Sequence, residues 1–314
     1  MNAADLPRVP SAAPDGTEAM ALGATMYVPV LHPDAGAIVA GDKHRALRSV
    51  VLCLEDALLA RDVERGFARL AALLLGAGDA PRFGDRPRPR LFLRPRDLAM
   101  ARRIARLDTL SAVEGFVVPK VAARDLGAWW RLAETLGLQL MPTLECAWVF
   151  DPLALRDFAL ALDDLDRGYL LALRVGGNDL LASLGLRRVR GRTVYEGPLA
   201  WGLSQIVCQL GSRGYPLTAP VFDVLDDPET LARECRLDAE FGFVGKTAIH
   251  PDQIGVIERG FAVSEGMVTI AHEALALDAD AVFRSEGVML EPATHRAWAR
   301  RTLARAAVYG VADP

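Results

Sequence analysis

The chain has 314 residues, of which 51% are hydrophobic and 24% charged, and its formal net charge is -4. This composition supports a large core and argues against nucleic acid or an anionic membrane as a partner. The five histidines and four widely separated cysteines lack the spacing of a zinc site. We therefore expect a soluble protein in which any metal is held by oxygen ligands.

Neither a membrane span nor a secretion signal is evident in the sequence. No run of about 18 apolar residues occurs, and the first two dozen residues lack a basic segment followed by an apolar one. We therefore predict a cytoplasmic protein with free thiols. Residues 1–24 are rich in Ala, Pro, Gly and Asp without periodicity, which predicts a mobile tail, with order beginning near Met26.

Eight short apolar runs follow this tail, and most of the gaps between them contain a helix-like pattern. The runs are Met26–Val30, Ser49–Leu54, Arg90–Leu93, Gly115–Pro119, Gln139–Thr143, Leu170–Val175, Pro216–Pro220 and Gly242–Lys246. Such a repeat predicts a (β/α)8 TIM barrel over residues 25–265. An open doubly wound sheet is the alternative, but no GxGxxG motif follows an early run, and the Gly176-Gly177 pair comes too late.

The C-terminal residues exceed what eight βα units need. After helix-like stretches at Pro251–Phe261 and Val268–Leu277, the segment Val282–Val308 has a turn at Gly287 and then a helix opened by Pro292. We predict that residues 266–314 form a helical lid and oligomerisation segment that packs on a neighbouring subunit.

Two apolar runs end in single carboxylates. Glu145 follows the fifth run and Asp179 follows the sixth, and an amphipathic segment at Val149–Leu165 separates them, as in a parallel βαβ unit. Carboxyl ends of parallel strands meet at one rim, so both acids could face one point and bind Mg²⁺. The alternative is that each acid only caps the helix that follows it.

Glu55 and Asp56 follow the second run and place two more acids at the same rim. Four acids at one rim need a cation, and one of this pair is expected to hydrogen-bond metal-bound water. A simple helix N-cap by Asp56 is the alternative.

Cationic side chains close the third and fourth runs. Arg94 emerges at the rim, where a guanidinium can hold a carboxylate through two hydrogen bonds. Arg96 is the rival candidate. Lys120 is predicted to act electrostatically rather than as a Schiff-base lysine. The basic stretch Arg187–Arg192 is interpreted either as a solvated loop or as a site for an anionic arm of the substrate.

The ordered set of motifs resembles one family. Leu54-Glu55-Asp56-Ala57, Arg94, Pro119-Lys120, Glu145, Gly177-Asn178-Asp179-Leu180 and Gly245–Ile254 look like citrate lyase beta subunits, malyl-CoA lyases and related hydroxy-acid aldolases. The match runs from about Met26 to His295. It is closest to a branch that reads Arg174-Val-Gly-Gly-Asn-Asp179 and Glu291-Pro-Ala-Thr-His295 and is found beside tellurite and stress-response genes.

The resemblance implies a barrel, usually trimeric, that binds Mg²⁺ at Glu145 and Asp179 and holds the substrate carboxylate at Arg94. We assign substrate contacts to Lys120, Gly177 and Asn178 as well, and catalytic roles to the residues Arg94, Glu55, Asp56 and Glu291. The family cleaves or forms a carbon–carbon bond beside a thioester, giving acetyl-CoA or an acyl-carrier equivalent and an α-keto acid such as oxaloacetate. A trimer or hexamer is expected.

Two other functions stay open. A metal-dependent aldolase for 2-keto-4-hydroxy acids, acting through pyruvate, would use nearly the same rim. The third possible function is that of a binding component of a stress-response complex, with little catalytic turnover.

Glu291 is our candidate for the acid/base group. The malyl-CoA lyases carry an aspartate in a Gly…Asp…His pattern, and this chain has Gly287…Glu291…His295 there. We predict that the C-terminal extension delivers Glu291 across a subunit interface. The alternative is a glutamate that only stabilises the first helical turn through the helix dipole.

Overall fold

The computed structural model describes residues 16–78 and 88–312. Within them one parallel sheet runs in the order β7-β6-β5-β4-β3-β2-β1-β8. Its strands are β1 (Ala24–Pro29), β2 (Ser49–Cys53), β3 (Arg90–Arg94), β4 (Val113–Val118), β5 (Gln139–Leu144), β6 (Leu173–Val175), β7 (Leu217–Thr218) and β8 (Lys246–Ala248).

The two end strands of this order meet and close the sheet. Ala219, just after β7, bridges Lys246 of β8, and the Ala219 amide donates to the Gly245 carbonyl at 2.8 Å. A closed ring of eight parallel strands is the TIM barrel that the apolar runs predict, and that prediction is confirmed.

Seven of the eight predicted runs coincide with strands, and the last is displaced. The run Gly242–Lys246 overlaps β8 only at Lys246. Gly242 has a φ of 87° and belongs to the turn that ends α9, so Phe243 and Val244 are buried without being part of a strand. Burial alone produced the apolar pattern there.

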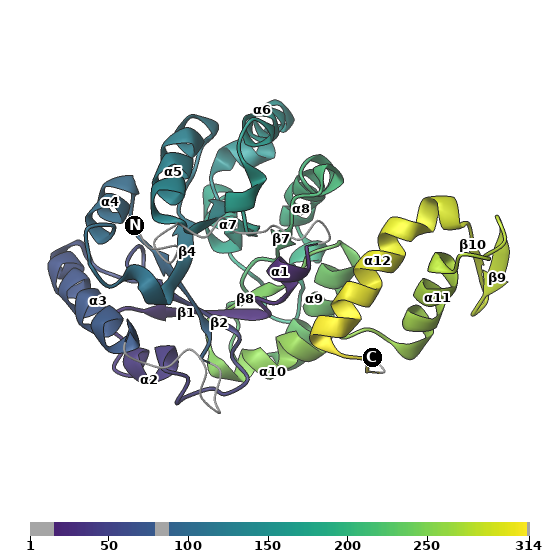
Figure 1. The fold of residues 1–314 in the computed structure, drawn as a ribbon, viewed down its shortest axis with the longest axis horizontal. Coiled ribbons are helices and arrows are strands. Elements are labelled where there is room, and N and C mark those ends of the chain that lie inside the picture. Colours follow the sequence, from purple (N-terminus) through teal and green to yellow (C-terminus); the bar gives the residue numbers. More distant parts are fainter. Residues whose placement is uncertain (1–15, 79–87, 313–314) are drawn as a thin grey trace, which may run out of the picture.

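Helices surround the sheet (Figure 1). They are α2 (Ala35–Val39), α3 (Val63–Gly78), α4 (Leu98–Ile104), α5 (Ala123–Leu136), α6 (Pro152–Asp163), α7 (Gly177–Ser183), α8 (Leu199–Gln209), α9 (Pro228–Glu240) and α10 (Pro251–Gly260). Three of them begin at an aspartate whose side chain accepts a main-chain N–H: Asp97, Asp151 and Asp227. Such local signals explain why the helix starts are readable in the sequence.

The amino-terminal end of the barrel is plugged by α1 (Thr17–Met20). Ala19, Met20 and Leu22 are buried against the inward-facing residues of the strands, which include Val51 and Phe92. The prediction of a mobile tail is therefore wrong for residues 16–24, because their apolar side chains fill the barrel floor. Residues 1–15 lie outside the described part of the chain.

The C-terminal segment forms an arm of α11 (Glu265–Leu275), a hairpin of β9 (Phe283–Ser285) and β10 (Val288–Leu290), and α12 (Pro292–Tyr309). The predicted turn at Gly287 is the turn of this hairpin, where Glu286 and Gly287 have φ values of 47° and 80°. Figure 1 shows the arm projecting to one side of the barrel.

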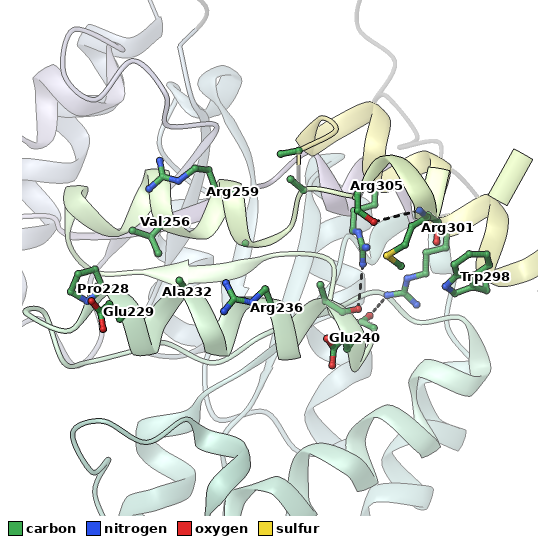
Figure 2. Close-up of a pocket in the computed structure, with 18 of the residues that line it drawn as sticks. Pro228, Glu229, Ala232, Arg236, Glu240, Val256, Arg259, Trp298, Arg301 and Arg305 are labelled. Carbon is green, nitrogen blue, oxygen red and sulfur yellow. Dashed lines mark hydrogen bonds between the residues drawn. The ribbon is translucent and has the colours of Figure 1, made fainter. Parts of the chain in front are cut away.

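The last turns of α12 attach the arm to the barrel's amino-terminal end. Tyr309 Oη donates to the Val244 carbonyl at 2.6 Å, and Arg301 and Arg305 donate to the carbonyls of Gly242 and Ala239 at the end of α9 (Figure 2). Cations at a helix C-terminus are stabilised by its dipole. None of the described helices is both long enough and apolar enough to span a membrane.

Candidate active site

Six charged side chains from the sequence analysis lie at the carboxyl ends of β2 to β6, and we call them the rim cluster. A closed parallel barrel brings all its strand ends to one rim, so residues far apart in sequence meet there. The rim cluster consists of Glu55, Asp56, Arg94, Lys120, Glu145 and Asp179.

Arg94, the last residue of β3, lies between two buried glutamates. Its Nη2 donates to Glu55 Oε2 at 3.0 Å and to the two carboxylate oxygens of Glu145 at 3.0 and 3.1 Å. Burial by itself would lower the pKa of the guanidinium, but Tyr27, Glu145 and Glu55 raise it above its ordinary value. Arg94 Nε is buried without a hydrogen-bond partner in the described structure, so this cation retains a donor for a ligand.

Arg96, the rival candidate, turns away from the cluster. Its Nη1 donates to the main-chain carbonyls of Leu58 at 3.0 Å and Glu55 at 3.4 Å. Arg96 therefore fixes the loop after β2, and the geometry favours Arg94 as the group that meets a substrate.

Lys120 follows β4 with a φ of 47°, which is uncommon for a residue other than glycine. Its main-chain N–H donates to Glu145 Oε1 at 2.7 Å, while its Nζ donates to Glu55 Oε1 at 2.6 Å and Asp56 Oδ2 at 3.0 Å. Burial lowers the pKa of the amine, but Glu55 and Asp56 outweigh it and raise the pKa. A charged Lys120 fits the predicted electrostatic role, because a Schiff-base lysine must lose its proton.

Glu145 and Asp179 stand at the ends of neighbouring strands. Glu145 is 3% exposed, and Asp179 lies half-buried in the first turn of α7. Gly176 makes room for Glu145, because a Cβ at position 176 would overlap the Glu145 side chain. Burial raises the pKa of both acids, and the Asp179 charge adds to the rise at Glu145. A hard cation would relieve the repulsion between two such carboxylates.

Within residues 16–78 and 88–312 no group of three or more His, Cys, Asp or Glu side chains is arranged around a metal position. A cation at the rim would therefore have Glu145 and Asp179 as its protein ligands and would complete its shell with water and substrate, as Mg²⁺ commonly does. The donor set fits Mg²⁺, and the assignment of these two ligands stays a prediction.

The two neighbours of Asp179 differ in what they can contribute. Gly177 is buried where a Cβ would overlap Pro220, so its lack of a side chain serves packing. Asn178 is exposed in the first turn of α7, beside the rim cluster in sequence. Of the two, only Asn178 has a side chain that can reach a ligand.

Glu291 lies apart from the other predicted site residues. It immediately precedes α12, and its main-chain N–H is bonded to His295 Nδ1 at 3.1 Å. The opposite end of α12 is fixed to the amino-terminal end of the barrel, and an 18-residue helix is roughly 27 Å long. The extension therefore does not cover its own rim, and the predicted lid could act only on another copy.

A separate cleft of about 1030 Å³ lies on the outer wall of the barrel between α9, α10 and α12 (Figure 2). Its charged side chains are mainly guanidinium groups: Arg236, Arg259, Arg301 and Arg305, beside the acids Glu229 and Glu240. No member of the rim cluster lines it. The predicted site residues with facing carboxylates lie at the rim instead.

Sequence reasoning missed a second charged cluster, which we call the α9 network. Lys246 Nζ donates to Glu234 Oε1 at 2.9 Å and to Asp238 Oδ2 at 2.7 Å, and Arg188 Nη1 donates to Glu234 Oε2 at 2.6 Å. Tyr195 Oη also donates to Asp238, at 2.6 Å. Arg188, from the basic stretch, is thus a buried structural cation, whereas Arg187 and Arg192 are exposed.

Comparison with known proteins gives the family. A family described as C–C bond lyases of the TIM-barrel fold matches residues 16–311. The chain therefore belongs to this family of carbon–carbon bond lyases. The resemblance seen in the motifs is confirmed.

Two relatives come from Cereibacter sphaeroides. A (3S)-malyl-CoA thioesterase is 28% identical over 284 residues, which cover 85% of this chain and 92% of the relative. An L-malyl-CoA/beta-methylmalyl-CoA lyase is 33% identical over 132 residues, which cover 38% of this chain and 41% of the relative.

A solved structure shares the fold. The protein CitE from Mycobacterium tuberculosis, in complex with magnesium, acetoacetate and coenzyme A, superposes with a TM-score of 0.63 at 24% identity. The superposition covers 92% of this chain and 99% of CitE.

Proposed function

We propose that the protein is a Mg²⁺-dependent lyase that cleaves a β-hydroxyacyl thioester, such as citryl-CoA or malyl-CoA, into an acetyl thioester and an α-keto acid. The observation that carries the proposal is Arg94 held between Glu55 and Glu145 at a rim with four acids and two cations. The magnesium and coenzyme A bound to the M. tuberculosis CitE support it.

Each rim residue has a role in this proposal. Glu145 and Asp179 hold Mg²⁺, which when bound supplies Lewis-acid stabilisation to the oxygens of the keto acid. Arg94 presents its remaining N–H groups to the substrate carboxylate. Lys120 and Asn178 lie at the same rim and are assigned to substrate binding.

Glu55 and Asp56 hold Arg94 and Lys120 in position through hydrogen bonds. Glu55 accepts from both Arg94 and Lys120, at 3.0 and 2.6 Å, and so fixes the two cations relative to each other. Asp56 keeps Lys120 directed toward the rim. These positions are set before substrate arrives, which lowers the cost of ordering them during the reaction.

The reaction needs one group that removes the hydroxyl proton as the carbon–carbon bond breaks and its electron pair passes to the thioester enolate, and that then returns a proton to the enolate carbon to give the acetyl thioester. We assign this step to Glu291 of a neighbouring copy in a homo-oligomer. The arm projects away from its own rim, which supports delivery to another subunit (Figure 1). A closed interface would also exclude water from the enolate.

The test of the activity is a product analysis. The protein is incubated with citryl-CoA or with malyl-CoA, with Mg²⁺ or with a chelator. We expect acetyl-CoA and the keto acid in equal amounts, and neither product when the metal is removed. Free CoA with intact hydroxy acid would instead show hydrolysis, the reaction named for the thioesterase relative.

Two controls separate the remaining functions. The pyruvate aldolase alternative predicts Mg²⁺-dependent exchange of pyruvate protons in deuterated water, which a thioester lyase does not require. A binding component would bind keto acid with Mg²⁺ but turn over none of these substrates.

Subunit complementation tests Glu291. An inactive Glu291→Gln protein is mixed with an inactive Asp179→Asn protein under conditions of subunit exchange. Recovered activity supports delivery between subunits, because some rims then combine an intact Asp179 with an intact Glu291. Full activity of Glu291→Gln alone would remove it from the mechanism.

A further inference from the structure

Arg174, in the middle of β6, is a buried cation without an acidic partner. It is 1% exposed, and its side chain points into the barrel, where its Nη2 donates to Thr247 Oγ1 at 2.7 Å and its Nη1 to Thr25 Oγ1 at 3.4 Å. Its Nη1 also donates to Met141 Sδ at 3.7 Å, so the acceptors are two hydroxyl groups and a thioether sulfur, none of them charged. A buried guanidinium whose charge is not balanced is costly, so its presence calls for an explanation.

The other buried cations of the described chain make the contrast clear. Arg94, Arg188 and Lys246 each form ion pairs with two carboxylates. No ion pair involves Arg174 within residues 16–78 and 88–312. Arg174 is therefore the exception in a protein that otherwise neutralises its buried cations.

Threonines surround Arg174 at the same level of the barrel. Thr143 of β5 and Thr218 of β7 are its register partners in the two adjacent strands. Among the residues that the structure describes, the hydroxyl groups of both are buried without a hydrogen-bond partner, and so is Arg174 Nε. We call Thr25, Thr143, Arg174, Thr218 and Thr247 the threonine layer. Three unpartnered polar atoms in one layer are groups that a ligand would satisfy.

The threonine layer lies directly beneath the rim cluster. Thr143 is two residues before Glu145, and alternate residues of a strand point to the same side, so the layer is roughly 7 Å below the predicted metal ligands. Met141 and Ala172, two residues further down, are apolar and completely buried. A polar ligand would therefore enter from the rim and stop at this layer.

Tyr27 connects the two levels. Its ring lies 5.3 Å from the Arg174 guanidinium carbon and 5.9 Å from that of Arg94, and its side chain is partly exposed although it faces inward. Solvent therefore reaches down the barrel mouth to the ring that contacts both guanidinium groups.

We propose that the threonine layer is a second anion subsite, which takes the far carboxylate of a dicarboxylic α-keto acid. This inference rests on the proposed lyase function, in which Arg94 and a Mg²⁺ held by Glu145 and Asp179 would bind the other end of the keto acid. Arg174 supplies the charge, and the hydroxyl groups of Thr143 and Thr218 donate to the carboxylate oxygens. The protein then favours the oxaloacetate class of keto acid over glyoxylate and pyruvate.

The test measures binding of four keto acids by calorimetry in the presence of Mg²⁺. We expect the wild-type protein to bind oxaloacetate and 2-ketoglutarate at least tenfold more tightly than glyoxylate and pyruvate. Arg174→Met should lose this preference, with the affinity for the two dicarboxylates falling tenfold or more and that for the two monocarboxylates changing less than twofold. Thr218→Val removes one hydroxyl and should weaken only the dicarboxylates, by several fold.

Folding is monitored in the same variants. Because Arg174 has no acidic partner, Arg174→Met should keep or raise the Tm of the ligand-free protein, whereas a purely structural arginine would lower it. Arg259→Met, on the exposed face of α10, is the matched control and should change neither selectivity nor Tm. One contrary result is that Arg174→Met weakens all four keto acids equally, and another is that the wild type binds all four with the same affinity. Either result would overturn the subsite.

A failure of the proposed function gives a different pattern. If no keto acid binds with Mg²⁺ but succinate raises the Tm of the wild type and not of Arg174→Met, the subsite holds and the lyase proposal fails. If succinate raises neither Tm and no keto acid is preferred, the subsite is excluded whatever reaction the rim performs.

Discussion

The rim cluster and the α9 network use the same types of side chain and differ in balance and access. In the α9 network, Lys246 and Arg188 face Glu234 and Asp238, and all four are at most 8% exposed. Arg188 also pairs with Asp223, whose side chain is 32% exposed. In the rim cluster, four acids face two cations, and the side chains of Lys120 and Asp56 are 46% and 63% exposed.

The difference separates a structural cluster from a site. The central side chains of the α9 network pair with one another and are closed to solvent, and burial raises the pKa of Asp238 to about 6 although Lys246 opposes the rise. The rim has an excess of negative charge and opens to water, so it can accept a cation and exchange ligands. The rim cluster and the α9 network therefore differ in their excess of negative charge and in their exposure to solvent, and not in the number of their ion pairs.

The largest expected effect is on folding, through Glu234→Gln. Removing this charge leaves Lys246 and Arg188 short of a buried partner, which should lower the free energy of unfolding by about 3–5 kcal/mol. Denaturant unfolding measures it. Glu64→Gln, which breaks the exposed pair with Arg103, is the control and should leave stability nearly unchanged. Equal stability of both variants would show that the α9 network is not a structural cluster.

The next effect is on binding, through Glu145→Gln and Asp179→Asn. Each removes one of two anionic ligands, so Mg²⁺-dependent affinity for the keto acid should fall at least about 100-fold. The Tm of Asp179→Asn should stay near that of the wild type, whereas the Tm of Glu145→Gln should fall, because Glu145 is a buried partner of Arg94. Calorimetry with Mg²⁺ and with a chelator measures it. Asp252→Asn, at an exposed position on α10, is the control. Unchanged affinity in either variant contradicts the metal assignment.

A smaller effect is expected from Arg94→Lys. The variant keeps the charge and loses the planar fork, at a cost of about 1.5–3 kcal/mol, which is roughly a 10–100-fold loss of kcat/KM. Steady-state kinetics of the lyase reaction measures it. Arg96→Lys, whose arginine bonds to loop carbonyls, should be milder. If Arg94→Lys has wild-type kinetics and Arg96→Lys does not, the substrate contact belongs to Arg96.

The strands, the helix starts and the meeting of the rim residues could be predicted from the amino-acid sequence. Apolar runs locate the strands because each is buried in the sheet, and aspartates such as Asp97 and Asp227 mark helix starts because the cap is a local hydrogen bond. A closed parallel barrel then requires Glu55, Arg94 and Glu145 to meet, because each follows or ends a strand.

The displaced eighth strand and the buried floor show where local patterns fail. Phe243 and Val244 are apolar because they are buried, although they form no strand. Leu22 and the short helix α1 have too few residues for any periodicity, yet they close the barrel. Burial in these places depends on segments that are distant in the chain.

The sequence by itself determined the barrel, its family and the acids of the rim, because these depend on the order of elements and on residues next to strand ends. Only the tertiary structure decided that Arg188 pairs with Glu234, that Arg174 pairs with no acid of the described chain, and that the arm leaves its own rim uncovered. The physical reason is that side-chain pairing follows strand register and barrel closure. These bring together positions such as Thr25, Arg174 and Thr247, whose separation along the chain carries no local signal.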